Sequence, residues 1–413
     1  MSNTQKKNVP ELRFPGFEGE WEEKKLEDTL EFIKDGTHGT HENVNNGPWL
    51  LSAKNIKNNK IIISSDDRKI SESDYKKIYK NYKLEKGDLL LTIVGTIGRA
   101  AIVKNPNNIA FQRSVAILKT KATYDVEFIF QLFQTKYFKN LLLRKQVVSA
   151  QPGLYLGDIR KIKISITNII EEQRKIGIFF RKIDRQIELE EQKLELLQQQ
   201  KKGYMQKIFS QELRFKDENG NDYPDWEEKK LGEFAGKVIQ KNTDKKYTET
   251  LTNSAELGII SQRDFFDKEI SNIDNIKNYY VVEENDFVYN SRISTYAPFG
   301  PVNRNKLGKK GVMSPLYTVF RIQNSDLNFI EFYFKSSKWY RFMALNGDSG
   351  ARADRFSIKD KTFMEMPLYI PCMDEQIKIG QFFNNIDKCI KNYQSKINLL
   401  KKYKKSFLQK MFI

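Results

Sequence analysis

The sequence predicts an α+β protein built from two mixed α/β domains, each followed by one long helix, with a pseudo-two-fold tandem repeat relating the halves. Three observations predict this fold class. A stretch of the first half returns in the second half at a constant shift, apolar residues in both copies follow helical spacing, and short β-rich runs precede each copy. Repetition of a frame in this way indicates a duplicated structural unit.

The strongest repeat reads EEQRKIGIFFRKIDRQI at residues 171–187 and DEQIKIGQFFNNIDKCI at residues 374–390. At a shift of 203 residues, 10 of these 17 positions are identical. The match resumes between residues 193–209 and 396–412, where 8 of 17 positions are identical. Chance does not produce this agreement, so we interpret the chain as a tandem duplication.

Each half also opens in the same way. ELRF at residues 11–14 is followed by WEEKKL at 21–26, and both segments return, at 212–215 and 226–231. The spacers between them hold Pro and Gly, which favour turns. We expect the tryptophan that begins each WEEKKL segment to be a packing anchor.

The first domain is predicted at residues 1–170, including its entry segment, and the second at 211–370. Both contain short β-rich runs, such as DLLLTIV at 88–94, separated by Asn, Gly and Asp turns. Each also has an aromatic helical segment, at 126–142 or 328–343, which we interpret as core rather than as a base-stacking platform. The two bodies differ in sequence more than the repeated entry segments and long helices do. This favours two recognition modules that read different targets.

The two long helices are predicted at residues 171–210 and 371–413. A helix of this size extends for about 55–60 Å at about 1.5 Å per residue. Its apolar residues recur at steps of three and four, which is typical of a coiled-coil seam, and the other copy is the obvious partner. The alternative is an ordinary amphipathic helix that lies on its own domain. The predicted seam consists of Ile176, Phe180, Ile183, Ile187, Leu194, Leu197, Ile379, Phe383, Ile386, Ile390, Ile397 and Leu400.

The formal net charge of +17 points to a polyanionic partner, most simply nucleic acid. Residues 1–170 carry 28 basic and 19 acidic side chains, whereas residues 211–373 carry 24 of each. A binding face on the second domain must therefore come from local clustering. Lysine supplies 53 of the 70 basic residues, so an AT-rich genome is an alternative cause of part of this charge.

The composition favours a cytoplasmic protein without a membrane anchor. No run of 18 apolar residues suggests a transmembrane helix, and the N-terminal segment MSNTQKKNVP lacks the apolar core of a signal peptide. Cys372 and Cys389 fit a reducing compartment and have no metal-ligand spacing. We therefore expect a cytoplasmic location, no metal and no membrane partner.

Three stretches imitate catalytic or ligand motifs. His38 and His41 suggest a metal site, but no cysteine or helix supports them, so a polar loop is the preferred interpretation. Residues 95–99 resemble a phosphate loop but lack the GK[ST] ending, which favours a β-turn with a backbone-contacting arginine. Residues 224–229 imitate a nuclease signature without carboxylates on paired strands. No methyltransferase motif or nucleophile–base arrangement is visible, so we expect no catalytic residues and no enzyme activity.

Contact with DNA is a better use of the loops. Arg and Lys bind phosphate or read guanine, whereas Asn and Gln read adenine. A solvated surface residue is the alternative for each candidate. The candidates in the first domain are Thr37, His38, Lys54, Asn55, Arg99, Gln112, Arg113 and Gln151, and those in the second are Arg263, Asn290, Arg292, Tyr296, Arg304, Lys309, Lys310, Arg352 and Arg355.

With two divergent bodies, each followed by an EQxKIGxFFxxID helix, the chain resembles the specificity (S) subunit of Type I restriction–modification systems. The repeat segments 172–184 and 375–387 carry this resemblance, which covers nearly the whole chain. Three short segments of the first body, 35–38, 87–90 and 95–98, also resemble motifs of the family's target-recognition domains. The second body departs from them, because residues 285–292 resemble a different class of that domain.

The resemblance implies two target-recognition domains separated by two long helices that form an antiparallel coiled coil. Each domain would read one half of a bipartite, asymmetric DNA site, and half-sites one turn apart are separated by about 34–36 Å. The implied partners are double-stranded DNA, two methyltransferase (M) subunits and restriction/translocase (R) subunits. The chain would be a non-catalytic component of host defence that directs adenine methylation by its partner, with the base flipped out.

The resemblance also implies that the catalytic steps take place on the partner subunits. S-adenosylmethionine, ATP and Mg are expected on the partner subunits and no cofactor on this chain. Four residues on the exposed helix faces are candidates for a partner surface, with a solvated face as the alternative: Arg181, Lys182, Arg185 and Glu188.

Two other functions remain as alternatives. One is a single-chain methyltransferase or nuclease, against which the missing motifs weigh. The other is a coiled-coil scaffold that bridges DNA without reading its sequence. Comparing the affinity for random duplexes with that for specific duplexes distinguishes such a scaffold from a sequence-specific protein. Salt-sensitive binding alone shows only phosphate contact. From the predicted boundaries we also expect that removing residues 374–413 leaves a soluble first domain.

Overall fold

The computed structural model describes residues 8–146, 153–265, 276–349 and 354–413. The chain divides into two compact units, the first formed by Met1–Gln192 with Ser395–Ile413 and the second by Lys193–Gln394. Each unit combines a sheet-containing body with one end of each long helix. This partition differs from the predicted one, which kept the helices apart from the bodies.

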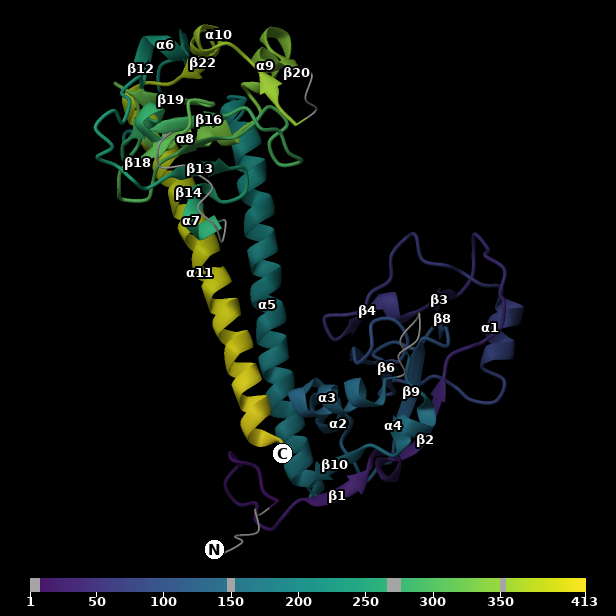
Figure 1. Cartoon of the computed structure of the whole chain (residues 1–413). Coiled ribbons are helices and arrows are strands. Elements are labelled where there is room, and N and C mark those ends of the chain that lie inside the picture. The colour runs from purple at the N-terminus through teal and green to yellow at the C-terminus, as the bar shows by residue number, and fades with distance from the viewer. Residues whose placement is uncertain (1–7, 147–152, 266–275, 350–353) are drawn as a thin grey trace, which may run out of the picture. The chain divides into compact units, whose positions relative to one another are not determined.

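The first unit is built around a four-stranded antiparallel sheet with the order β2-β9-β6-β7 (Figure 1). Residues of β6 alternate between two cores: Leu89 and Leu91 join the one that contains the long helices, and Leu90 joins the other. Burial on both faces explains why three leucines follow one another at residues 89–91. In chain order the unit contains β1 (Glu22–Lys25), the 3₁₀ helix η1 (Leu26–Thr29), β2 (Leu30–Asp35), β3 (Trp49–Leu51), η2 (Ala53–Asn55), β4 (Ile56–Lys57), β5 (Lys60–Ile61), α1 (Glu72–Ile78), β6 (Leu89–Thr92), β7 (Ala100–Ile102), β8 (Ile109–Phe111), β9 (Val115–Thr120), α2 (Val126–Gln134), α3 (Lys136–Lys145), α4 (Leu156–Arg160) and β10 (Lys163–Ile166).

The second unit repeats this plan with the strand order β12-β19-β16-β17. Phe287 and Tyr289 of β16 face the core that contains the long helices, and Val288 faces the other. The two sheets therefore share one topology although their sequences differ. The unit contains β11 (Glu227–Lys230), α6 (Leu231–Phe234), β12 (Ala235–Lys237), β13 (Leu251–Ser254), β14 (Gly258–Ser261), α7 (Gln262–Phe265), η3 (Ile276–Asn278), β15 (Tyr280–Val282), β16 (Phe287–Asn290), β17 (Val302–Arg304), β18 (Gly311–Met313), β19 (Tyr317–Ile322), α8 (Leu327–Lys335), α9 (Tyr340–Asn346), β20 (Asp348–Ser349), β21 (Phe356–Ser357), α10 (Asp360–Met364) and β22 (Pro367–Ile370).

The entry segments and the aromatic helices complete each core. WEEKKL forms strand β1 or β11, which pairs antiparallel with the strand just before the long helix, β10 or β22. Trp21 and Trp226 are 2% and 8% exposed, so the predicted packing anchors are confirmed. The aromatic residues Phe128 of α2 and Phe329 of α8 are fully buried, as expected for core.

The two long helices are α5 (Ile170–Phe209, 40 residues) and α11 (Met373–Met411, 39 residues). In the first unit the beginning of α5 packs against the end of α11, with the rings of Phe179 and Phe407 5.2 Å apart (Figure 1). In the second unit the end of α5 packs against the beginning of α11, with Tyr204 and Phe382 also 5.2 Å apart. The two pairings run in opposite chain directions, so the helices are antiparallel.

All twelve predicted seam residues are buried or half-buried. Several of them also contact the bodies: Ile176 and Phe180 belong to the core of the first unit, and Ile379 and Phe383 to that of the second. The long helices are therefore part of each domain core and not only a spacer.

The end of α11 completes the first unit. Leu408, Met411 and Phe412 lie in the same core as Trp21, and the Leu12 amide donates to the Lys410 carbonyl at 2.8 Å. The structure therefore argues against the expectation that the first domain stays soluble without residues 374–413. Within the described residues, no helix is long and apolar enough to cross a membrane.

Candidate nucleic-acid interface

The repeated glutamate anchors each entry segment to a long helix. Glu172 and Glu375 are fully buried. Arg13 donates to both oxygens of Glu172, at 2.6 and 2.8 Å, and this bond raises the pKa of Arg13. Arg214 donates to Glu375 at 2.7 Å in the second unit. Two-pronged contacts of this kind fix orientation as well as distance.

The repeated glutamine joins each long helix to the aromatic helix of its body. Gln173 accepts from the Asp125 amide at 2.8 Å and donates to the Thr167 carbonyl at 2.7 Å. Gln376 accepts from the Asp326 amide and donates to the Pro371 carbonyl, both at 2.9 Å. The aspartate in each unit is also the N-cap of α2 or α8. The repeat therefore holds both sheets to their helices by the same contacts.

The loops at residues 37 and 112 come together in the first unit. The Thr37 amide donates to the Phe111 carbonyl at 2.8 Å, and the Arg113 amide donates to the Thr37 carbonyl at 3.1 Å. The side chain of Arg113 is exposed and that of Gln112 is half-buried. Three predicted DNA-binding residues thus occupy one polar surface.

The two histidines lie in the same loop region. His38 is exposed and contacts Asp35 at 2.5 Å. His41 contacts the Thr37 hydroxyl at 2.9 Å and Asp74 at 3.5 Å. Among the residues that the structure describes, no group of three or more His, Cys, Asp or Glu side chains could hold a metal ion. The geometry is that of a polar loop.

Lys54 and Asn55 are engaged inside the unit. Asn55 is 4% exposed and donates to Asp67 at 2.7 Å and to the Ile62 carbonyl at 2.9 Å. Lys54 forms an ion pair with Asp67 at 2.7 Å. Burial opposes ionisation of Asp67, but the bonds from Lys54, the Ser64 amide and Asn55 together lower its pKa. These contacts give Asn55 a structural role, and its contact with DNA stays a prediction.

The turn between β6 and β7 agrees with the preferred interpretation of residues 95–99. Gly95 and Gly98 have φ angles of +78° and +85°, and the Gly98 amide donates to the Thr92 carbonyl at 2.9 Å. The Arg99 guanidinium reaches the Ile56 carbonyl at 3.4 Å. The predicted β-turn with a backbone-contacting arginine is therefore confirmed.

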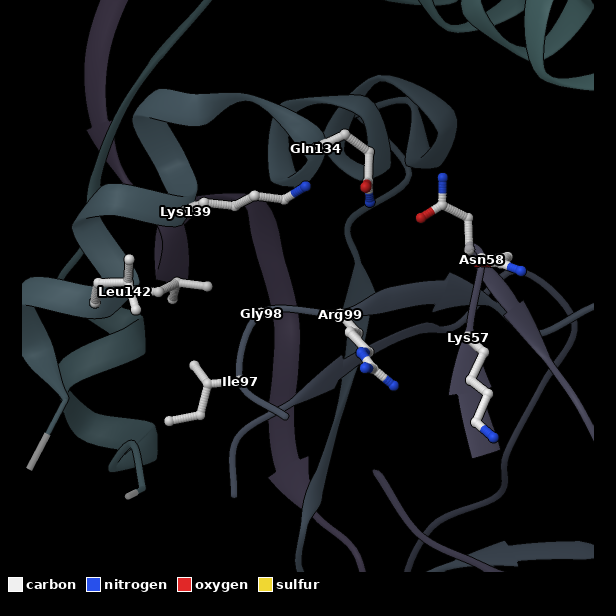
Figure 2. Close-up of a pocket in the computed structure, with 10 residues that line it drawn as sticks. Lys57, Asn58, Ile97, Gly98, Arg99, Gln134, Lys139 and Leu142 are labelled. Carbon is white, nitrogen blue, oxygen red and sulfur yellow. The ribbon is translucent and has the colours of Figure 1, made fainter. Parts of the chain in front are cut away.

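Arg99 lies on the wall of a cavity of about 580 Å³ (Figure 2). The other polar residues of its wall were not predicted from the sequence, although the Asn58–Asn59 pair is a recognisable hairpin turn. The lining consists of Lys57, Asn58, Asn59, Ile97, Gly98, Arg99, Gln134, Lys139, Leu142 and Leu143.

A second group of candidates gathers near the end of β16. Asn290 donates to the Asn253 carbonyl at 2.8 Å and accepts from the Arg292 amide at 3.0 Å. Arg292 and Arg355 form an isolated β-bridge, which brings these two arginines together. Tyr296 is 72% exposed. Arginine and asparagine side chains are residue types that contact DNA phosphates or bases.

The remaining candidates of the second unit lie elsewhere. The Arg304 side chain is 8% exposed and forms an ion pair with Glu331 at 2.9 Å, so it acts within the body. Lys309 and Lys310 are exposed and form ion pairs with Glu249 and Glu283. Arg263 is also exposed. Two further candidates, Gln151 and Arg352, lie outside the described residues.

The nuclease-like stretch is a set of surface ion pairs. Asp225 contacts Arg214 at 3.4 Å, and Glu227 contacts Lys229 at 2.9 Å. The two carboxylates thus have separate cationic partners.

Comparison with known proteins also finds two equivalent domains in this chain. The family model for the Type I restriction modification DNA specificity domain matches twice, at residues 18–199 and 223–402. A putative type I restriction enzyme MjaX specificity subunit from Methanocaldococcus jannaschii is 25% identical, with 94% of this chain and 92% of that protein covered.

Solved structures show the same fold. The crystal structure of a Type I restriction–modification S subunit from M. genitalium aligns with a TM-score of 0.58 at 14% identity, covering 98% of this chain and 99% of that one. A chain from a structural study of complex assembly and conformational transition of the type I R-M system aligns at 0.50, also at 14% identity, with 95% and 97% covered. The predicted fold class of two mixed domains and paired long helices is confirmed.

Proposed function

This chain belongs to the Type I restriction–modification DNA specificity family, and we propose that it reads a bipartite, asymmetric DNA site through its two units. Specificity subunits are the non-catalytic recognition components of these systems, so sequence-specific DNA recognition is the function of the chain. One observation supports the bipartite site above all others. The two sheets share one strand order and the same attachment to α5 and α11, but their loops differ in sequence.

We further propose that the chain directs two methyltransferase subunits, and through them restriction/translocase subunits, to this site. S-adenosylmethionine, ATP and Mg would then be bound by those partners. Of the four helix residues considered for docking, Arg181, Lys182 and Arg185 are exposed. Glu188 is held by Lys60 at 2.6 Å and by Arg185 at 3.1 Å, which leaves it less suited to a partner.

A domain exchange tests the proposal. Residues 232–368 are replaced by the corresponding body of another specificity subunit, and the methylated adenines are mapped by sequencing DNA from cells that carry the partner subunits. One half of the methylated sequence should change and the other half should stay. The same exchange in the first body is the matched control and should change the opposite half. An unchanged methylated sequence after either exchange would contradict the two-module function.

A further inference from the structure

The cavity beside Arg99 is lined by cations that have no carboxylate partner. Lys57, Arg99 and Lys139 contribute to its wall, and none of the described residues that line it is acidic (Figure 2). Among the described residues, no ion pair joins any of these three side chains to a carboxylate. Neighbouring lysines differ in this respect, since Lys54 and Lys60 are paired with Asp67 and Glu188. A concave surface with uncompensated positive charge attracts an anion.

Amide groups add hydrogen-bond donors to the same wall. The Gln134 side chain points into the cavity together with that of Asn58 (Figure 2). The Gln134 Nε2 atom is shielded from solvent and has no hydrogen-bond partner among the described residues. A buried donor without a partner costs about 1–3 kcal/mol. A ligand oxygen that accepts from Gln134 would remove this cost.

Local structure fixes the wall that carries Lys57 and Asn58. Strands β4 and β5 are joined by Asn58 and Asn59, whose φ angles are +49° and +63°. Two successive residues with positive φ form the tight type of turn that suits a hairpin. Lys60, directly after the turn, forms an ion pair with Glu188 of α5 at 2.6 Å. The hairpin is therefore attached to the long helix and presents Lys57 in a defined position.

The opposite wall is partly apolar. Ile97 of the β6–β7 turn lies opposite Leu142 of α3, and both line the cavity (Figure 2). Gly98 lies between Ile97 and Arg99 in this wall, and its φ of +85° favours glycine at this position. Leu143 also lines the cavity and is 59% exposed. The ligand should therefore combine an anionic group with an apolar part.

Lys139 supports the same ligand chemistry. Lys139 is exposed as a whole, but partial desolvation of its ammonium group, with a smaller contribution from Lys404, lowers its pKa. An anion placed between Lys139 and Arg99 would offset this penalty on the charged form.

We propose that this cavity binds a sugar–phosphate segment of the DNA backbone, with the phosphodiester on Lys57, Arg99, Lys139 and Gln134 and the deoxyribose against Ile97 and Leu142. The proposal deepens the proposed function and rests on it. Phosphate contacts position a protein on DNA without reading bases. The cavity would thus set how the first unit lies on the duplex, while the loops of residues 37 and 112 are left to contact base edges.

Salt-dependent binding tests this assignment. The full-length Lys57→Gln/Arg99→Gln variant is compared with wild type on a fluorescent 40-base-pair duplex of random sequence across a sodium chloride series. The slope of log affinity against log salt should fall by about 0.9 for each phosphate that the variant no longer binds. At 0.1 M salt, this corresponds to roughly eightfold weaker binding per phosphate. The control Lys76→Gln/Lys80→Gln removes two exposed lysines of the same unit outside the cavity and should keep the wild-type slope.

The outcomes distinguish the possible sources of the anion. Equal slopes for the cavity variant and the control would overturn the proposal. Competition by inorganic phosphate beyond its ionic strength, abolished in the cavity variant while the slope is unchanged, would assign the cavity to free phosphate instead. The melting temperatures of both variants should match wild type, because all four side chains are exposed.

Failure of this inference is separable from failure of the proposed function. A phosphate contact strengthens binding of all sequences alike. The methylated sequence found in the domain exchange should therefore be the same with and without the Lys57→Gln/Arg99→Gln change. A changed methylated sequence in this variant would show base reading by the cavity and would contradict the backbone assignment.

Discussion

Two glycines of α5 have opposite surroundings. A Cβ atom on Gly177 would lie 2.6 Å from Asp125 Oδ1 and 3.1 Å from the Phe128 amide nitrogen, whereas nothing lies within 4 Å of a Cβ on Gly203. Gly380 repeats the first situation, at 2.6 Å from Asp326 Oδ1. The glycine of the repeated KIG segment therefore lets each long helix approach the N-terminus of α2 or α8.

This contrast predicts opposite effects of one substitution. Gly177→Ala should destabilise the protein by about 1–3 kcal/mol, because the methyl group overpacks a backbone contact. Gly203→Ala should stabilise it by about 0.5–1 kcal/mol, since alanine is the better helix former and meets no neighbour. Urea denaturation of both variants measures the difference. Equal effects would contradict the close approach at Gly177.

Glu331 is a buried acid of the second unit that is surrounded by cations. It is 6% exposed and contacts Arg304 at 2.9 Å, Lys306 at 3.2 Å and Lys335 at 2.8 Å. Burial alone would raise its pKa, but the charges of Lys335, Lys306 and Arg304 together lower it below the ordinary value of 4.5. The folded state therefore holds the ionised form more strongly than the unfolded chain does.

The sign of this shift gives a pH prediction. A lowered folded pKa contributes stability that is present above the unfolded value, about 4.5, and is lost as the pH falls through the folded value. Glu331→Gln should lower stability by about 1–3 kcal/mol at neutral pH and flatten the loss of stability below about pH 4.5. Thermal melting from pH 7 to pH 3 checks both effects. If the stability of the variant fell at acid pH as steeply as that of the wild type, Glu331 would be excluded as the source of this pH dependence.

Residue roles were the least predictable part of the sequence. Asn55 and Arg304 are residue types that read bases, yet both are used inside their bodies, by Asp67 and by Glu331. Their partners are 12 and 27 positions away, a separation that no local pattern reveals. Exposed candidates such as Arg113 and Tyr296 agree with their predicted placement on the surface. The cavity beside Arg99 combines residues 57 to 143, so its formation depends on the tertiary fold.

At the scale of elements, α5 and α11 form two equivalent ion pairs, one in each unit. Asp387 of α11 pairs with Lys201 of α5 at 2.5 Å in the second unit. Asp184 of α5 pairs with Lys404 of α11 at 2.6 Å in the first. In each ion pair, the aspartate comes from one copy of the repeat and the lysine from the other copy. The two copies therefore carry complementary charges that favour antiparallel pairing with each other.

A charge exchange tests this register. Lys201→Asp and Asp387→Lys should each destabilise the second unit by roughly 1 kcal/mol, because each places like charges together at a half-exposed site. The double variant restores the pair and should recover most of the stability. Denaturant titration of the three variants measures the coupling. Additive destabilisation in the double variant would contradict direct contact between these residues.

The long elements were predictable because their signal is periodic. Apolar steps of three and four over some 40 residues identify α5 and α11 within one or two residues at each end. The short strands gave only partial signals, such as the run at 88–94, and their order in the sheet was not predicted. Sheet order depends on contacts between distant segments, as in the pairing of β2 with β9.

At the scale of the whole molecule, the compact units do not follow the chain order. The first unit contains both the N-terminal body and residues 395–413. Phe412 lies against Phe128 at 5.1 Å and against Trp21 at 6.1 Å between ring centres. Its equivalent, Phe209, lies against Phe329 and Trp226 in the second unit. The repeat was predicted from the sequence, but the predicted domain boundaries lay between the bodies and the helices.

Removing one of these rings should affect the body that it enters. Phe412→Ala should cost about 3–5 kcal/mol and lower amide protection across the sheet of the first unit, far from the substitution in sequence. Phe209→Ala is the matched control and should lower protection in the second unit. Hydrogen exchange resolved by peptide measures both. A decrease in protection confined to residues 395–413 would contradict a shared core.

The contact between Trp21 and Phe412 also has a consequence for synthesis. During translation the sheet of the first unit emerges well before Leu408, Met411 and Phe412, which complete its core. The nascent chain must therefore carry an unfinished apolar surface while the whole second unit is synthesised. A ribosome that stalls before residue 408 would release a chain whose first unit is exposed to aggregation and proteolysis.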